Sequence, residues 1–413
     1  MSDASILNQK LVDQLKRDGH IRSAPVEAVF RAVPRHLFLP DTPLEQVYSD
    51  QAIITKRGEA GAPISSSSQP AIMAIMLEQL DLQRGQRVLE IGAGTGYNAA
   101  LIAHIVGAVG KVVAIDIDAE IVENAREHLR AAGVENVRVI CGDGGLGYAD
   151  TAPYDRIILT VGAWDIVPAW IEQLQAGGRL VLPLALRGGV QKSIAFEKRD
   201  DYLASLSVRD CGFMTLRGAF AATQNAVQLR PDPALRLTVD DSVLVNSDTL
   251  YRLLTEGGKD WNTGIELTGR EIFGGLNLWL ALKEATYCRL EAIGEMAKRG
   301  LVPRLFGGMD KYCATNGVLG DASLSVLVRP PDHGEEDGEN STRFELFVRQ
   351  FGADDALAQR LVSQIRAWDA AGRPSSERLR VRAYPREATP ALLNPEFMIE
   401  KTWTRLAIEW VQE

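Results

Sequence analysis

The chain has 413 residues, enough for two to three domains, and its 46% hydrophobic and 24% charged residues are the balance of an ordinary globular protein. No apolar run reaches the length of a membrane span, and the start of the chain lacks the pattern of a secretory signal, so we expect no membrane partner. Lysine and arginine number 45 against 54 acidic residues, a net charge of −9 without a basic block, which disfavours nucleic acid as the main partner.

The first part of the chain is predicted to be helical. Leucines recur at a spacing of four from Leu7 to Leu15, which predicts helix within residues 5–40. A glycine-, serine- and proline-rich stretch at 58–70 follows, and residues 71–80 then read as a helix. We expect Ser67 or Ser68 to cap that helix, because serine hydroxyls accept hydrogen bonds from the first free amides.

From residue 87 onward, short apolar runs alternate with helical stretches such as 119–132. Apolar strands joined by helices predict a parallel sheet that is covered on both faces. An antiparallel hairpin should follow, because 193–198 and 203–208 flank Asp200-Asp201. The predicted parallel strands are 87–91, 111–116, 137–140, 155–160 and 179–183.

A second unit begins between residues 222 and 240, so we predict a catalytic domain at 1–230 and a C-terminal α+β domain at 231–413. Alternating apolar residues predict strands at 324–328, 344–348 and 379–383. Between the last two, a stripe from Leu357 to Trp368 predicts a helix capped by Asp354, with the stripe in the core. The acidic segment 330–341 is interpreted as a solvated loop.

The strongest signal is a glycine-rich turn that follows one predicted strand and opens a helix. Gly92, Gly94 and Gly96 are spaced GxGxG, which differs from the GxGxxG that is typical of NAD sites. A dinucleotide would place its pyrophosphate at the start of the helix. Glu90, just before the glycines, suits a cationic ligand better, because a carboxylate there can face an ammonium group.

Two more acids end the next two strands. Asp116 lies 20 residues past Gly96, where an acid can accept hydrogen bonds from both ribose hydroxyls. Asp143 ends the third strand and could accept from an adenine amino group. Three acids at successive strand ends suit S-adenosyl-L-methionine, which is cationic and carries no phosphate. The alternative is that all three are helix caps beside ordinary turns.

Residues 5 to about 220 resemble the protein-L-isoaspartate O-methyltransferase family. The resemblance implies a carboxyl methyltransferase that uses S-adenosyl-L-methionine and releases S-adenosyl-L-homocysteine. It also implies the α/β class I methyltransferase fold, a Rossmann-like doubly wound sheet, with two extra N-terminal helices. The segments that carry it are, in order, Ala32–His36, Ile64-Ser65, Val88–Tyr97, Gly110–Val112, Gly142–Gly144, Ala152–Asp155, Val167-Pro168, Gln173-Leu174 and Gly177–Pro183.

The resemblance also implies roles for individual residues. Ser65 would lie beside the methyl donor and orient the substrate carboxylate, which is already ionised at neutral pH and needs no general base. Lys56, Arg57, Ser66, Ser68 and Trp164 are the predicted substrate contacts. No metal is expected. The predicted cofactor contacts are Ser65, Glu90, Ile91, Gly92, Gly94, Gly96, Tyr97, Asp116, Ile117, Asp143, Gly144 and Thr160.

The chain departs from the family pattern near the substrate. The usual Pro-His-Met after the Ile-Ser pair is replaced by Ser66–Pro70, and the preceding loop, 54–63, looks longer than usual. Trp164-Asp165 stands where repair enzymes have small residues. With the long C-terminal extension, these features resemble a subgroup, the FxLD system methyltransferases, found beside clusters for ribosomally made peptides.

That subgroup predicts methylation of one aspartate in a lanthipeptide, lasso peptide or graspetide. The ester would then cyclise to an aspartimide, which can hydrolyse to isoaspartate. One alternative is a repair methyltransferase that acts on isoaspartate; a binding module with a degenerate methyltransferase fold is another. Trp164 and Trp170 could also be core aromatics.

The four cysteines are far apart and form no metal or disulfide pattern, so a cytoplasmic location is expected. The partner is expected to be a peptide or protein that carries aspartate or isoaspartate. The oligomeric state stays open. The C-terminal domain could hold the peptide substrate, pack on the catalytic domain or form a dimer.

Overall fold

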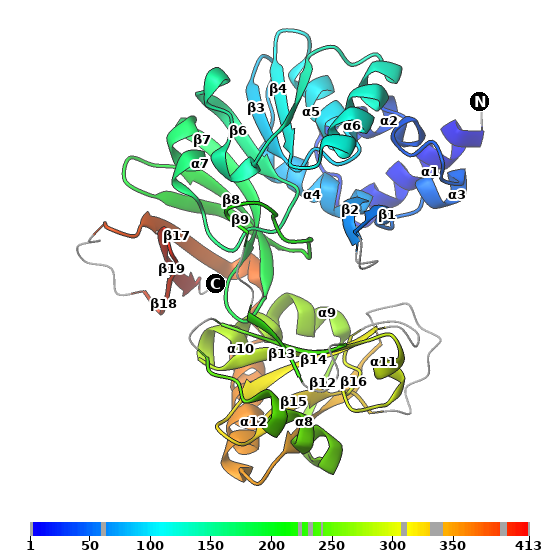
Figure 1. Ribbon diagram of the computed structural model, residues 1–413. Coiled ribbons are helices and arrows are strands. Elements are labelled where there is room, and N and C mark those ends of the chain that lie inside the picture. The colour runs from blue at the N-terminus through cyan, green and yellow to red at the C-terminus, as the bar shows by residue number, and fades with distance from the viewer. Residues whose placement is uncertain are drawn as a thin grey trace. The chain divides into compact units, whose positions relative to one another are not determined.

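The computed structural model of the protein divides into two compact units, which are described separately (Figure 1). The first unit contains residues 1–184, 191–222 and 380–409, and the second contains 185–190, 223–379 and 410–413. The residues that the structure describes are 3–58, 63–221, 225–229, 234–240, 243–306, 312–330, 342–388 and 395–411.

The first unit is built on a ten-stranded sheet with the order β18-β19-β17-β9-β8-β7-β6-β3-β4-β5. The five consecutive strands at one end of this order, β7-β6-β3-β4-β5, are parallel, which confirms the class I methyltransferase fold. These strands are β3 (Arg87–Ile91), β4 (Lys111–Asp116), β5 (Val137–Cys141), β6 (Tyr154–Leu159) and β7 (Leu174–Ala185). The predicted hairpin is present as β8 (Gln191–Lys198) and β9 (Leu203–Asp210), which pair antiparallel.

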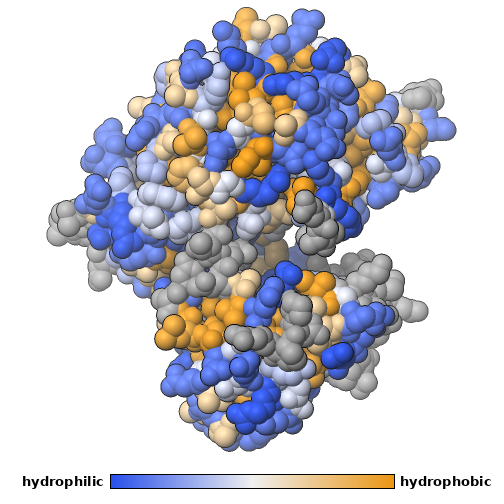
Figure 2. Space-filling view, viewed as in Figure 1, coloured by the Kyte–Doolittle hydropathy of each residue, from blue (hydrophilic) through white to orange (hydrophobic). Residues whose placement is uncertain are grey.

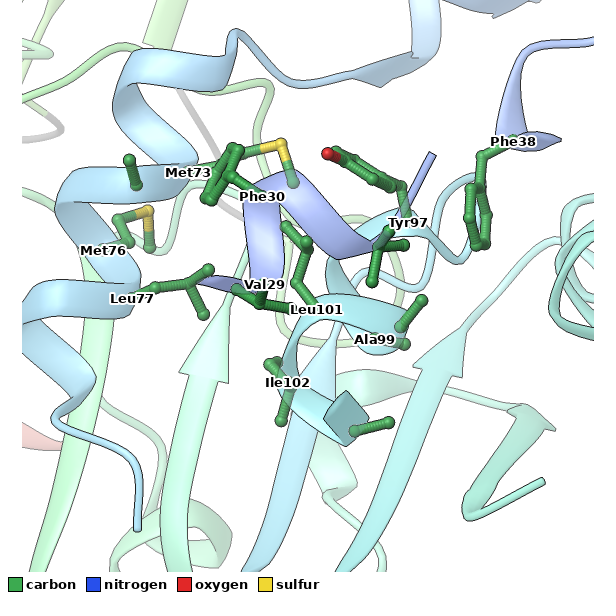
Figure 3. Close-up of a cluster of buried hydrophobic side chains, with 14 of the residues drawn as sticks. Val29, Phe30, Phe38, Met73, Met76, Leu77, Tyr97, Ala99, Leu101 and Ile102 are labelled. Carbon is green, nitrogen blue, oxygen red and sulfur yellow. The ribbon is translucent and has the colours of Figure 1, made fainter. Parts of the chain in front are cut away.

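Helices of this unit pack their apolar faces together beside the sheet. Figure 3 shows side chains of α2 (Ala24–Ala32), α4 (Pro70–Leu80) and α5 (Tyr97–Val106) meeting in one cluster, with Phe38 at its edge. Burial of this cluster fixes where α5 starts, and therefore where the glycine turn lies. The other helices are α1 (Asp3–Arg17), η1 (Arg35–Phe38), α3 (Leu44–Val47), α6 (Ala119–Ala131), η2 (Gly144–Leu146), η3 (Ala149–Thr151) and α7 (Pro168–Gln173).

Two local predictions for this region need correction. The N-cap of α4 is Gln69, not Ser67 or Ser68, and it makes no side-chain capping bond. Ser67 instead ends strand β2 (Pro63–Ser67), which pairs antiparallel with β1 (Ile53–Arg57). The segment interpreted as a long loop, residues 54–63, therefore includes most of β1 and the first residue of β2. Residues 59–62 lie outside the described part of the chain.

The two compact units also differ from the predicted division of the chain at residue 230. Residues 380–409 return to the first unit and extend its sheet as β17 (Leu379–Pro385), β18 (Phe397–Glu400) and β19 (Thr404–Trp410). Strand β17 pairs with β9 through Arg382–Ala204 and Ala383–Leu203. The physical reason is that β9 would otherwise be an open edge with unpaired amides and carbonyls.

The second unit has a seven-stranded antiparallel sheet with the order β10-β11-β13-β14-β15-β16-β12. Its strands are β10 (Asn225–Gln228), β11 (Leu235–Val239), β12 (Lys259–Leu267), β13 (Tyr287–Ile293), β14 (Tyr312–Leu319), β15 (Leu324–Val328) and β16 (Phe344–Phe351). Its helices are α8 (Ser247–Glu256), α9 (Gly269–Glu271), η4 (Ile272–Leu276), α10 (Asn277–Lys283), α11 (Glu295–Lys298), α12 (Asp355–Ala370) and η5 (Ser376–Arg378).

Helix α12 confirms the predicted stripe. Asp354 caps it by accepting hydrogen bonds from the amides of Ala356 and Leu357, and the stripe from Leu357 to Trp368 lies in the core of this unit. Most of the predicted acidic loop, residues 331–341, lies outside the described residues. Within the described residues, no helix is long and apolar enough to cross a membrane. Hydrophilic residues are spread over the visible faces of both units (Figure 2).

Candidate active site

The glycine turn lies between the end of β3 and the start of α5. Gly92, Gly94 and Gly96 have φ angles of 101°, 51° and 85°, a region that L side chains rarely adopt. A Cβ on Gly92 would lie 2.6 Å from Oγ1 of Thr160. The turn therefore needs its glycines both for backbone conformation and for space.

Neighbouring strand ends hold this turn in place. The hydroxyl of Thr160, just after β6, donates to the carbonyl oxygen of Gly92 at 2.6 Å. Just beyond β5, a Cβ on Gly144 would lie 2.4 Å from Cγ2 of Ile91, so the Gly144 backbone packs directly against the Ile91 side chain. Trp170 Nε1 donates to the Gly144 carbonyl at 2.9 Å, and its side chain is fully buried, which confirms the core interpretation of this tryptophan.

Glu90 is fully buried at the end of β3. Its Oε1 accepts a hydrogen bond from Asn98 Nδ2 at 2.8 Å, whereas Oε2 has no partner among the described residues. Burial, with a smaller contribution from the nearby charge of Asp116, raises the pKa of Glu90 to about 8. A buried carboxyl group with one unpartnered oxygen can accept a hydrogen bond from a cationic ligand group.

Asp116 ends β4 beside the glycine turn. Its Oδ2 accepts from the amide of Gly94 and its Oδ1 accepts from the amide of Asp118, both at 3.2 Å. Ile117, the next residue, keeps 39% of its surface exposed, although it is a large apolar residue. A carboxylate next to an open apolar side chain suits a ribose with its attached base.

Asp143 lies at the end of β5 and is held by two backbone amides. Its Oδ1 accepts from Gly145 at 2.9 Å, and its Oδ2 accepts from Ala219 at 2.7 Å. Arg217 Nη2 lies 3.7 Å from Oδ1 of Asp116. Residues 217–220 therefore border both acids, and sequence reasoning missed this segment because nothing in its own composition marks it.

Ser65 lies on β2 and is 7% exposed. The hydroxyl of Thr55 on β1 donates to Oγ of Ser65 at 3.0 Å. In this arrangement the Ser65 hydroxyl keeps its own proton available for a carboxylate. Ser66 pairs with Ile54 in the same hairpin, and Ser68 follows the end of β2.

Lys56 and Arg57 are the predicted cationic contacts of the substrate, and they lie on β1. Lys56 Nζ bonds both carboxylate oxygens of Asp118, at 2.8 and 2.9 Å, and Oε2 of Glu120 at 2.8 Å. These partners raise the pKa of Lys56, and Lys56 lowers the pKa of Asp118. The positive charge of Lys56 is thus balanced by carboxylates of the protein. This ion pair connects the β1–β2 hairpin to the N-terminus of α6. Arg57 lies opposite Pro63.

A buried arginine positions the residues around Ser65. Arg35 is fully buried, and its guanidinium donates to the carbonyl oxygens of Val47 at 2.7 Å and Ser68 at 3.0 Å. It also donates to the hydroxyl of Ser67 at 3.3 Å. Burial lowers the pKa of Arg35. In the sequence, Arg35 stood out only as part of the family resemblance, because its main acceptors are backbone carbonyls that lie far away along the chain.

The side chains of Tyr97, a predicted cofactor contact, and Trp164, a predicted substrate contact, pack against other parts of the protein. The Tyr97 ring is buried between Phe30 and Phe38 in the core, with centroids 6.5 and 5.4 Å away, and burial raises its pKa (Figure 3). Only the backbone of Tyr97 is left beside the glycine turn. Trp164 is half-buried, and its Nε1 donates to the carbonyl of Phe220 at 3.2 Å. Among the described residues, no cluster of histidine, cysteine or acidic side chains could hold a metal.

A parallel doubly wound sheet with three acids at its strand ends around a GxGxG turn defines a class I methyltransferase. The unpartnered Glu90 oxygen fits the cationic methionine part of the donor, and the open apolar Ile117 fits its nucleoside. A model of the protein-L-isoaspartate(D-aspartate) O-methyltransferase family matches residues 6–220. The chain belongs to this family, whose members are carboxyl methyltransferases that use S-adenosyl-L-methionine.

Individual relatives agree with the family match. The chain is 37% identical over 260 residues to a protein-L-isoaspartate O-methyltransferase of Thermotoga maritima, covering 60% of this chain and 80% of the relative. It is 40% identical over 204 residues to one of Pyrococcus horikoshii, covering 49% and 88%. A solved protein-L-isoaspartate O-methyltransferase is similar with a TM-score of 0.50 and 25% identity, covering 91% of this chain and 96% of that one.

Proposed function

We propose that this methyltransferase acts in repair, by transferring a methyl group to the free carboxylate of isoaspartyl residues in proteins and peptides. The observation that carries the proposal is the family match over residues 6–220, together with an intact set of glycines and acids at the strand ends. The relatives named above are protein-L-isoaspartate O-methyltransferases, which supports the same reaction here.

We assign the donor-binding roles to the strand ends. Glu90 would face the ammonium group of the methionine part, Asp116 the ribose hydroxyls and Asp143 the adenine amino group. Gly92, Gly94 and Gly96 would let the backbone approach the donor closely. When bound, the donor supplies an electrophilic methyl group to the site.

Ser65 is proposed as the positioning residue for the substrate. The substrate carboxylate is ionised at neutral pH, so proton abstraction is not required. The Ser65 hydroxyl, which accepts from Thr55, can donate one hydrogen bond and align a carboxylate oxygen for in-line attack. One hydrogen bond orients the anion without neutralising it, so its nucleophilicity is kept.

The product chemistry follows from the ester. An ester has a better leaving group than a carboxylate, so the next backbone nitrogen can attack it, release methanol and form a five-membered succinimide. Intramolecular closure benefits from a high effective concentration. Water can later open the ring to aspartate or isoaspartate, so repeated cycles convert isoaspartate to aspartate.

A second candidate is aspartate methylation in a ribosomally made peptide, followed by aspartimide formation. The observation that favours it is the rebuilt segment Ser66–Pro70, which lacks the family's usual histidine. Trp164, which stands where repair enzymes have a small residue, is its other support. In this candidate a normal aspartate, held by a macrocycle, would take the place of isoaspartate.

A substrate panel separates the two candidates. Methyl transfer would be measured to a linear isoaspartyl peptide, to the same peptide with normal aspartate, and to macrocyclic peptides that contain a normal aspartate. Repair predicts transfer to the isoaspartyl peptide alone. Transfer to a macrocycle and none to the linear isoaspartyl peptide would support peptide maturation instead.

A further inference from the structure

The C-terminal hairpin contributes an aromatic residue to the donor side of the first unit. Trp403 lies between β18 and β19, and its ring centroid is 5.4 Å from that of Trp164 and 5.4 Å from that of Phe220. All three belong to the first unit but to different stretches of it. Trp403 lies outside the part of the chain that matches the family model, residues 6–220.

A buried carboxylate anchors Trp403 itself. Asp165 is 2% exposed and follows Trp164 in the loop after β6. Its Oδ2 accepts from the amide of Trp403 at 2.7 Å, and its Oδ1 accepts from the hydroxyl of Thr404. Hydrogen bonds to a buried carboxylate are strong, so the position of the Trp403 backbone is fixed relative to the loop that carries Trp164.

On its other side, Trp403 contacts the segment 217–220. The Phe220 carbonyl accepts from Trp164 Nε1, and the Phe220 ring lies so close to Gly145 that a Cβ there would be 2.2 Å from ring carbon Cδ2. The Phe220 ring therefore packs against Gly145 and the Trp403 ring, while its carbonyl is bonded by Trp164. The backbone just before it reaches Asp143, through the amide of Ala219.

Backbone hydrogen bonds and close packing restrict the conformation of the chain just before Phe220. Leu216 donates to the carbonyl of Gly162 at 2.8 Å, and Gly162 donates to the carbonyl of Met214 at 2.7 Å. A Cβ on Gly218 would lie 2.5 Å from Oδ2 of Asp143, and Gly218 has a φ of 104°. The segment is thus fixed at one end by Gly162 and at the other by the aromatic cluster.

We propose that Trp403 is a positioning residue for methyl-donor binding, because it holds residues 217–220 as a wall beside Asp116 and Asp143. The proposal rests on the assignment of these two acids to the donor nucleoside. It gives the C-terminal return, residues 380–409, a role in donor affinity beyond covering the edge of the sheet. The donor class it concerns is an adenine nucleoside sulfonium.

The test compares Trp403→Ala and Trp403→Phe with Trp410→Ala as the control. Trp410 ends β19, the strand that begins just after Trp403, and its ring centroid lies 6.3 Å from that of Trp279, in the second unit. The readouts on the full chain are the Kd for S-adenosyl-L-homocysteine by calorimetry, the KM for the donor and for an isoaspartyl peptide, and kcat.

We expect Trp403→Ala to raise the Kd and the donor KM about tenfold. The peptide KM and kcat at saturating donor should stay close to wild type. Trp403→Phe should recover most of the affinity, and Trp410→Ala should leave it unchanged. If Trp403→Ala does not fold, Phe220→Ala breaks the same contact from the segment and should give the same loss.

Asp116→Asn distinguishes failure of this inference from failure of the donor-site assignment. If Trp403→Ala binds with the wild-type Kd while Asp116→Asn binds weakly, the role of Trp403 is overturned and the donor site stands. If Asp116→Asn also binds like the wild type, the assignment of the nucleoside site falls, and the proposal for Trp403 falls with it.

Discussion

Glu90 shows how a single buried group sets the pH dependence of this fold. Its pKa is raised to about 8 in the folded protein by burial, against about 4.3 in an unfolded chain. The folded state therefore holds its proton over a range in which the unfolded state releases it. The stabilising effect of this raised pKa is complete below about pH 4.3 and is lost as the pH rises towards about 8.

Replacing Glu90 with glutamine removes this titration. We predict that the free energy of unfolding of Glu90→Gln, without donor, falls less between pH 5 and pH 8 than that of the wild type. Urea unfolding at several pH values measures this, with the exposed Glu123→Gln as the control. Parallel pH profiles for Glu90→Gln and wild type would contradict the buried, partly unpartnered state of this carboxyl.

Ser65 is the residue that we expect to align the substrate carboxylate. Ser65→Ala removes the hydroxyl that we expect to orient the carboxylate, so kcat/KM for an isoaspartyl peptide should fall about tenfold to a hundredfold. The Kd for S-adenosyl-L-homocysteine should change less than about threefold. Ser363→Ala is the matched control, since Ser363 is exposed on α12 and its hydroxyl donates to the Gln359 carbonyl within the same helix. Wild-type turnover by Ser65→Ala would refute the positioning role.

At the scale of elements, the β1–β2 hairpin depends on Arg35 from η1. Arg35→Met leaves several buried carbonyl oxygens without donors, so we predict a loss of about 2–4 kcal/mol in the free energy of unfolding. Activity should fall as well, because Ser67 and Ser68, two and three residues beyond Ser65, lose their donor. Denaturant titration checks the first effect and methyl transfer the second.

The exposed Arg130 on α6 supplies the matched control for this substitution, Arg130→Met. Arg35→Lys should recover only part of the stability, because an ammonium group cannot reproduce the fork of a guanidinium. Equal stability of Arg35→Met and Arg130→Met would show that the buried guanidinium does not hold the hairpin.

Elements whose signals are local could be predicted from the sequence. The strand before Gly92 and the acids Asp116 and Asp143 were found because apolar runs, glycines and acids follow one another within a few residues. The return of β17 could not be predicted, because its partner is distant: the amide of Val381 bonds the hydroxyl of Ser205, 176 residues away.

The contrast between local signals and distant pairing also applies to the residues of the candidate site. Side chains at strand ends were placed by periodicity, whereas Phe220 and Trp403 reach the site only through tertiary pairing. Lys56 was predicted from its place in the sequence as a substrate contact. Its ion pair with Asp118 depends on how the β1–β2 hairpin packs against α6, which no local sequence pattern encodes.

At the scale of the whole molecule, the first unit is discontinuous in sequence. We predict that a chain ending at residue 222 loses stability and tends to aggregate, because β9 becomes an open edge. A chain in which a flexible linker replaces 223–379 but 380–409 is kept should have the higher melting temperature of the two. Equal melting temperatures would contradict the role of β17–β19 in the sheet.

The linker variant also addresses the second unit, whose predicted role in holding peptide substrates stays a prediction. If that unit holds substrates, the variant should keep its Kd for S-adenosyl-L-homocysteine and its KM for a short isoaspartyl peptide, while its KM for an isoaspartyl protein rises. An unchanged KM for the protein substrate would remove this role.

We propose that acids at three strand ends bind the methyl donor over the glycine turn. The decisive measurement is a crystal structure of the full chain with S-adenosyl-L-homocysteine. We expect the ligand over Gly92–Gly96, with its ammonium group towards Glu90, its ribose on Asp116 and its adenine beside Asp143. Ligand bound elsewhere, or an empty turn at saturating ligand, would contradict it.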